Sequence, residues 1–333
     1  MMILGIESSC DETAAAVVED GRRLRSSVVA SQVAIHHRYG GVVPELASRK
    51  HIEMILPVVD QALDQAGIGP EDIEALAVTQ GPGLVGSLLV GFSFAKGYAY
   101  GLGIPWVGVN HLEGHIHSAF LDPHPPDFPF VALLVSGGHT ALYHVTSFTA
   151  AELMGQTRDD AVGEAYDKVA KVMGLGYPGG AVIDQRAAEG DPARVPFKRP
   201  FLDKNGFDFS FSGIKSAANR FVQSHADELA DLRPHIAAGF QEAVVDVLTH
   251  KLLAAAEHQG CSRIAVVGGV AANKRLRERV RAAGAARGFS VHIPSVAYCG
   301  DNAAMIAAVG YHYLQQGMRG GLGDDVYSRA SPH

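Results

Sequence analysis

Two histidines four positions apart are the strongest candidates for metal chemistry in this 333-residue sequence. On a helix, His111 and His115 would place both imidazoles on one face, at a spacing that suits chelation. The spacing alone is weak support, because 16 histidines in a chain of this length give about 0.8 such pairs by chance. Core or surface histidines are the ordinary alternative. A third ligand would have to come from elsewhere, and Asp301 is a candidate that could equally be a helix N-cap.

The order of residues around the histidines argues against a zinc peptidase. Such enzymes carry His-Glu-x-x-His, whereas the glutamate here is Glu113, between the histidines but not directly after the first. A metal bound at this position therefore has to serve another reaction.

Two glycine-rich turns could bind a phosphate group through main-chain N–H groups. Ser136, Gly137 and Gly138 separate two apolar runs, and glycines there let the backbone approach a ligand closely. The segment 268–273 separates an apolar run from a predicted helix, where Asn273 could cap the helix or contact an adenosine. An ordinary hairpin turn and an ordinary strand-to-helix turn remain the alternatives.

Four carboxylates stand in or beside predicted turns. Asp11 and Glu12 follow the first apolar run, where a carboxylate could act as a base or orient a metal-bound water. Asp167 and Asp184 flank the pair Gly179-Gly180 and could accept a ribose hydroxyl. Acidic residues are common in surface turns and on solvated helix faces, so each of them also has a structural explanation.

The elements that must position these residues form a plan that occurs twice. The first copy predicts three strands, a helix, a strand, a helix and a strand, at residues 3–7, 14–18, 27–30, 44–66, 73–78, 84–100 and 106–109. The second copy predicts strands and helices at residues 130–135, 141–145, 235–258, 263–267, 273–284, 290–293 and 302–314. The second copy also contains a predicted helical insertion at residues 155–220, between its strand at 141–145 and its helix at 235–258.

Such a duplication predicts an α/β fold of two lobes with a nucleotide cleft between them. It resembles the duplicated actin-like ATPase (RNase H-like) fold of actin, heat-shock ATPases and sugar kinases. We expect a first lobe at residues 1–112, with the closing helix at 301–316 packed back on it, and a second lobe at residues 113–300.

Composition limits the setting in which the protein works. Three widely spaced cysteines and no basic, apolar leader favour the cytoplasm, with no export and no membrane anchor. A formal charge of −7 disfavours RNA on average, so any RNA site has to be local. Candidate basic clusters are Arg22, Arg23 and Arg25; Arg194, Lys198 and Arg199; and Lys274, Arg275, Arg277, Arg279 and Arg281. The last group falls on a predicted helix, where a solvated face is the usual role.

The motifs together resemble the TsaD family nearly from end to end. The matching segments are residues 5–13 (GIESSCDET), 40–45 (GGVVPE), 80–84 (QGPGL), 96–97 (KG), 111–116 (HLEGHI), 134–140 (LVSGGHT), 167–168 (DK), 179–180 (GG), 209–215 (FSFSGIK), 268–273 (GGVAAN) and 299–305 (CGDNAAM). The resemblance implies transfer of threonylcarbamoyl from threonylcarbamoyl-adenylate to the exocyclic amine of the adenosine next to the anticodon, in tRNAs reading codons that start with A.

The resemblance also implies a role for particular residues. One divalent metal per chain, iron(II) with zinc as the alternative, is expected on His111, His115 and Asp301. Asp11 is expected to bear most directly on the chemistry. The expected adenylate site consists of Leu134, Val135, Ser136, Gly137, Gly138, Asp167, Gly180, Asp184 and Asn273. The implied protein partners are a degenerate paralogue of the same fold and a P-loop ATPase.

Three other functions compete with this interpretation. A phosphotransferase or ATPase of the same superfamily would share the glycine loops, but it does not explain His111, His115 and Asp301. A non-catalytic scaffold would need neither Asp11 nor the metal ligands. A peptidase fits least, for the reason given above.

Overall fold

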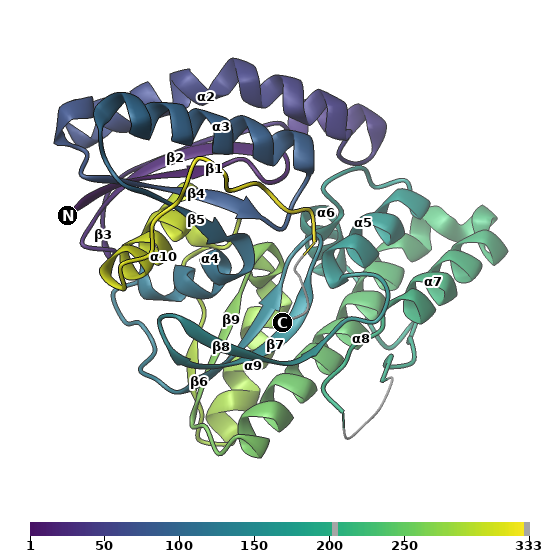
Figure 1. The fold of residues 1–333 in the computed structure, drawn as a ribbon. Helices are drawn as coiled ribbons and strands as arrows, with labels where there is room; N and C mark the ends of the chain where they lie inside the picture. The colour runs from purple at the N-terminus through teal and green to yellow at the C-terminus, as the bar shows by residue number, and fades with distance from the viewer. Residues whose placement is uncertain (202–205, 330–333) are drawn as a thin grey trace. The chain divides into compact units, whose positions relative to one another are not determined.

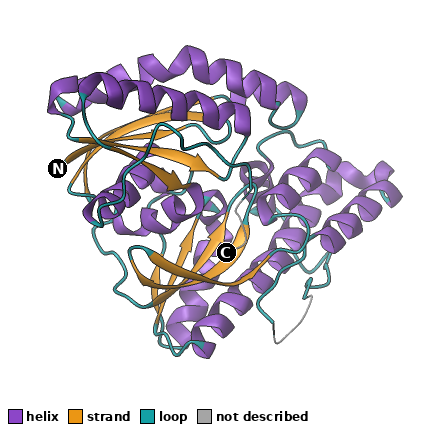
Figure 2. Cartoon of the chain, viewed as in Figure 1, coloured by secondary structure: helices purple, strands orange, loops and turns teal. Residues whose placement is uncertain are grey.

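The computed structural model describes residues 1–201 and 206–329. The chain divides into two compact units, Met1–Pro125 with Asp301–His333, and Pro126–Gly300. Each unit holds a five-stranded sheet with helices packed on it (Figures 1 and 2). The division lies after Pro125 and not after residue 112, because the helix that carries His111 and His115 packs against the closing helix of the first unit.

The first unit has a mixed sheet with strand order β3-β2-β1-β4-β5. The antiparallel strands β1–β3 pair in sequence, and β4 and β5 add in parallel beside β1. The strands are β1 (Met2–Glu7), β2 (Glu12–Glu19), β3 (Arg23–Ser31), β4 (Ala75–Gly81) and β5 (Trp106–Asn110). The helices are α1 (Val33–His36), α2 (Pro44–Ala66), α3 (Val85–Leu102), α4 (His111–His117) and α10 (Ala303–Gln315).

Both faces of this sheet are covered, which explains why its central strands are apolar throughout. Leu4 and Ile6 of β1 belong to the core beneath α2 and α3. Gly5, between them, faces α10 on the opposite side, where an added Cβ would lie 2.2 Å from the carbonyl oxygen of Ala303. Successive residues of β1 face opposite sides of the sheet, so the small Gly5 lets α10 pack closely on the side away from α2 and α3. Asp301, just before α10, is thereby held close to the sheet.

The second unit repeats the plan with strand order β10-β9-β6-β7-β8. Its strands are β6 (Phe130–Val135), β7 (Thr140–Ser147), β8 (Ala150–Gln156), β9 (Arg263–Val267) and β10 (Ser290–His292). Its helices are α5 (Val162–Val172), α6 (Gly179–Ala187), α7 (Ser212–Ser224), α8 (Leu229–His258) and α9 (Lys274–Ala286). Read from the other edge, this order matches that of the first sheet, which confirms the predicted duplication.

The structure differs from the sequence expectation in detail. Strand β8 was not predicted. The predicted helical insertion at residues 155–220 contains α5, α6 and most of α7, and α8 begins at Leu229 and not at residue 235. Short 3-10 turns lie at His37–Tyr39, Pro70–Asp72, Ser118–Phe120, Ala226–Glu228, Gly269–Ala272 and Val296–Tyr298. Within the described residues, no helix combines the length and apolar character needed to span a membrane.

Candidate metal centre and adenylate-binding residues

Helix α4 presents the two histidines one turn apart. The helix starts because Asn110 caps it, its Oδ1 accepting from the main-chain N–H of Leu112 at 2.8 Å. The imidazole rings of His111 and His115 lie with their centroids 4.7 Å apart. The chelating arrangement expected from the spacing is therefore present.

Asp301 comes to the same point from the other end of the chain. Its Oδ1 lies 3.2 Å from Nε2 of His115 and 3.5 Å from Nε2 of His111. One ligand atom from each of the three residues lies within 4.8 Å of the others. The alternative role of Asp301 as an N-cap is not observed, because Asn302 caps α10 by accepting from the N–H of Met305 at 3.0 Å.

These three residues fit a metal ion. His115 is fully buried, and neither of its ring nitrogens has a hydrogen-bond partner among the residues that the structure describes. A buried imidazole without partners is costly unless something else satisfies it. Two imidazole nitrogens converging on a carboxylate oxygen are a ligand set that suits iron or zinc.

The carboxylate of Glu7 supports His111 from behind. Glu7 is fully buried at the end of β1, and its Oε2 lies 3.0 Å from Nδ1 of His111. Burial acts to lower the pKa of His111, but the charges of Glu7 and Asp301 outweigh it and raise the pKa to about 9. We assigned no role to Glu7 from the sequence. A carboxylate at the end of a buried apolar strand is unusual, and this position could have marked Glu7 as a functional residue.

Asp11 and Glu12 lie in the electrostatic field of the same site. Asp11 is 7% exposed. Burial raises the pKa of Glu12 to about 9, and the negative charges of Asp301 and Asp11 add to this effect. Glu12 therefore holds a proton at neutral pH, beside Asp11, while the hydroxyl of Ser31 donates to its Oε1 at 3.0 Å.

In the second unit, the predicted glycine loop is a tight turn between β6 and β7. The N–H of Ser136 donates to the carbonyl of His139 at 2.8 Å, and the hydroxyl of Ser136 accepts from the N–H of His139 at 3.1 Å. A Cβ added to Gly137 or Gly138 would meet no protein atom within 4 Å. The space next to these two glycines is therefore available to a ligand, as a phosphate-binding turn requires.

The other predicted adenylate residues are connected to this turn through a series of contacts. The N–H of Gly163, at the start of α5, donates to the carbonyl of Ser136 at 3.2 Å. Farther along α5, Asp167 accepts from the N–H of Gly179 at 2.7 Å. Gly180 has open space where a side chain would be.

Asp184 and Asn273 meet at the start of α9. Oδ2 of Asp184 accepts from the N–H of Lys274 at 3.3 Å. Oδ1 of Asn273 caps α9 by accepting from the N–H of Leu276, and its Nδ2 donates to Gln241 at 2.7 Å. Gln241 was missed in the sequence, because an amide inside a long helix gives no local signal of its partner.

Leu134 and Val135 differ from the other predicted residues. Both side chains are fully buried in β6 and have no exposed surface to offer a ligand. Any contribution of these two residues to binding has to come from the main chain.

Several arginines of the predicted basic clusters form ion pairs within the protein. Arg275 pairs with Glu242 at 2.7 Å, and Asp246 pairs with both Arg279 and Arg199. These pairs form at helix faces of the second unit and reduce the positive charge available to RNA.

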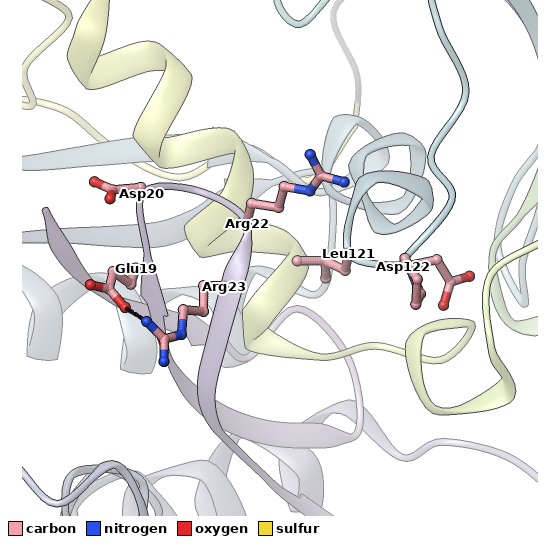
Figure 3. Close-up of a pocket in the computed structure, with 7 residues that line it drawn as sticks. Glu19, Asp20, Arg22, Arg23, Leu121 and Asp122 are labelled. Carbon is pink, nitrogen blue, oxygen red and sulfur yellow. Dashed lines mark ion pairs between the residues drawn. The ribbon is translucent and has the colours of Figure 1, made fainter.

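The cluster near residue 22 is likewise partly neutralised. Arg23 and Arg25 pair with Glu19 at 3.2 and 3.3 Å. Beside them lies an open depression of about 560 Å³, lined by Glu19, Asp20, Arg22, Arg23, Leu121, Asp122 and Pro123 (Figure 3). Its mixed charge and the absence of every predicted site residue from its lining set it apart from the metal centre.

Comparison with known proteins decides the family. The family model described as TsaD, tRNA N6-adenosine threonylcarbamoyltransferase, matches residues 23–308. A protein of that name from Desulforapulum autotrophicum is 63% identical over 329 residues, covering 99% of each chain. Another from Pelobacter propionicus is 54% identical and covers 98% of this chain and 96% of its own. This chain belongs to the TsaD family.

Solved structures support the fold of this TsaD-family chain. Component A of (R)-2-hydroxyglutaryl-CoA dehydratase from Acidaminococcus fermentans superposes with a TM-score of 0.56 at 14% identity, over 95% of this chain and 99% of its own. Full-length HypF gives a TM-score of 0.61 at 13% identity, over 98% of this chain and 47% of its own. The actin-like fold expected from the sequence is confirmed, and identities this low show the fold alone.

Proposed function

We propose that this chain transfers the threonylcarbamoyl group from threonylcarbamoyl-adenylate to the exocyclic amine of the adenosine next to the anticodon, in tRNAs reading codons that start with A. The observation that carries the proposal is the convergence of His111, His115 and Asp301 in a TsaD-family chain. Neither a phosphotransferase nor a scaffold of the same fold accounts for that ligand set, in which neither ring nitrogen of His115 has a hydrogen-bond partner among the described residues.

The difficulty of the reaction is a weakly nucleophilic amine. A divalent cation on His111, His115 and Asp301, iron(II) with zinc as the alternative, would supply a Lewis acid for a carbonyl or phosphate oxygen. Asp11 takes the amine proton or positions the reacting groups. Glu12 lies beside Asp11, and burial together with the negative charges of Asp301 and Asp11 raises the pKa of Glu12.

The second unit supplies the groups that bind the adenylate. In the turn of Ser136, Gly137 and Gly138, the N–H groups of the two glycines stabilise the departing AMP, where the turn leaves open space. Asp167 and Asp184 accept ribose hydroxyls. The site is completed by the main chain of Leu134 and Val135, by Gly180 and by Asn273.

Partners account for the action of an acidic chain on RNA. Arg199, Arg275 and Arg279 are already paired with carboxylates of the protein, which reduces the positive charge that they offer to phosphates. A degenerate paralogue of the same fold and a P-loop ATPase, together in the cytoplasm, would provide the remaining contacts.

The test is transfer of labelled threonylcarbamoyl to unmodified tRNA. The synthesised adenylate and both partner proteins are supplied to wild type, Asp11→Ala and the double variant His111→Ala/His115→Ala. Label in tRNA from wild type, lost in both folded variants, supports the proposal. A wild type that binds the adenylate or ATP tightly and transfers nothing would favour a phosphotransferase or a scaffold instead.

A further inference from the structure

Glu7 is a buried carboxylate whose surroundings need explanation. It ends strand β1 and is fully buried. Among the described residues, the one basic side chain at ion-pair distance from it is His111. A carboxylate so far from solvent is retained only where hydrogen bonds and a partner charge offset its desolvation.

The two oxygens of Glu7 are divided between two tasks. Oε1 accepts from the main-chain N–H of Ser9 and holds the loop that leads to Asp11. Oε2 accepts from the hydroxyl of Thr79 at 2.6 Å and faces Nδ1 of His111 at 3.0 Å. An ionised carboxylate only accepts hydrogen bonds, so Nδ1 of His111 has to carry the hydrogen in this contact.

That hydrogen determines what the other ring nitrogen can do. With Nδ1 protonated, the lone pair of the neutral imidazole is on Nε2, the atom that lies 3.5 Å from Asp301. His115 has no such support, because neither of its ring nitrogens is hydrogen-bonded to a described residue. Of the two imidazole rings, only that of His111 is therefore held in orientation by hydrogen bonds to described residues, among them the one to the carboxylate of Glu7.

We infer that Glu7 is a positioning residue, which fixes the Nε2-donating tautomer of His111 and increases the affinity of the site for a divalent cation. The inference rests on the metal-binding role proposed above for His111, His115 and Asp301. It assigns Glu7 no contact with substrate and no part in proton transfer from the amine.

A purely structural role for Glu7 makes a different prediction. If it served only to hold Ser9 and Thr79, its loss would lower stability and leave metal affinity unchanged. Metal binding must therefore be measured apart from activity. Co²⁺ is a suitable probe, because its visible absorption reports the ligand field while competition with a chelator gives the dissociation constant.

The experiment compares metal-free, full-length wild type with Glu7→Gln and with Ser26→Ala. Ser26 is the matched control, a buried polar residue of the same sheet whose hydroxyl oxygen accepts from the N–H of Val17. Glu7→Gln should weaken Co²⁺ binding about 10- to 100-fold and alter the absorption bands. Ser26→Ala should bind Co²⁺ as wild type does.

Each contrary outcome identifies what has failed. Wild-type affinity and spectrum in folded Glu7→Gln would overturn the positioning role and leave the metal centre intact. No Co²⁺ binding by wild type would overturn the metal centre, and this inference with it. Should Glu7→Gln not fold, ¹⁵N spectra of Zn²⁺-loaded wild type decide the matter. Hydrogen on Nδ1 and metal on Nε2 of His111 support the inference, and metal on Nδ1 refutes it.

Discussion

At the scale of single residues, the first unit gathers several groups that are costly to bury. Glu7, His115 and Asp11 are all at least nine-tenths buried, and the carboxyl groups of Glu12 and Asp301 lie near them. Burial raises the pKa of Glu12, and the negative charges of Asp301 and Asp11 raise it further. A cation among the three ligands would relieve both the repulsion and the missing partners of His115.

Replacing Asp301 by asparagine tests that view. The change keeps the shape of the side chain, removes one negative charge and leaves the cap of α10 on Asn302. We expect Asp301→Asn to lose at least ~90% of bound metal, because a neutral amide is a poorer ligand than a carboxylate. Metal content by mass spectrometry and thermal unfolding of the metal-free protein check this. Full metal occupancy in the variant would remove Asp301 from the ligand set.

The sequence predicted which residues form the site better than it predicted the contacts between them. The four-residue spacing of His111 and His115 is a local pattern, and it predicts both side chains on one face of a helix. Contacts between Glu7 and His111, or between His115 and Asp301, join positions more than a hundred residues apart, and no local pattern specifies them. They follow from the sheet order, which brings β1 beside β4 and α10 beneath both.

At the scale of elements, predicted and observed structure agree where a segment is buried on one side or on both. Strand β6 is apolar throughout and was predicted. Strand β8, with sequence Ala-Ala-Glu-Leu-Met-Gly-Gln and mostly exposed residues, was missed. It is an edge strand that follows β7 and has few β-branched or aromatic side chains, so neither hydrophobic pattern nor propensity indicates it.

The close packing of α10 on the first sheet gives a stability prediction. A Cβ added at Gly310 would lie 2.2 Å from the Cβ of Ala77 in β4. Gly310→Ala should lower the free energy of unfolding by about 1–3 kcal/mol through overpacking. Gly97→Ala is the control, since a Cβ there meets nothing within 4 Å and should be neutral or stabilising. Chemical denaturation measures both, and equal effects would show that α10 does not pack as described.

The same helix carries a group that should make stability depend on pH. Burial lowers the pKa of His312 to about 4, below its ordinary value near 6.5. Protonation therefore favours the unfolded chain, and this cost grows as pH falls from about 6.5 towards 4. His312→Gln should lose less stability than wild type between pH 7 and pH 4.5 in urea denaturation. An unchanged loss would mean that His312 is protonated as readily in the folded protein as in the unfolded one.

At the scale of the whole molecule, the chain combines an acidic average with chemistry on RNA. Its formal charge is −7, and arginines that looked available in the sequence bind Glu242 and Asp246. Long-range attraction for tRNA is therefore weak, and productive binding has to rely on local contacts and, as proposed above, on partner proteins. Under that proposal, assays of the isolated chain would underestimate its activity.

The most direct test of the account is to titrate metal into the metal-free chain and follow single-turnover transfer. With the adenylate, unmodified tRNA and both partners present, the amount of labelled tRNA should rise with added iron(II) or zinc and level off at about one ion per chain, the number that one three-residue site holds. His111→Ala/His115→Ala should show no such rise. Full transfer by the metal-free wild type in the presence of a chelator would contradict the account.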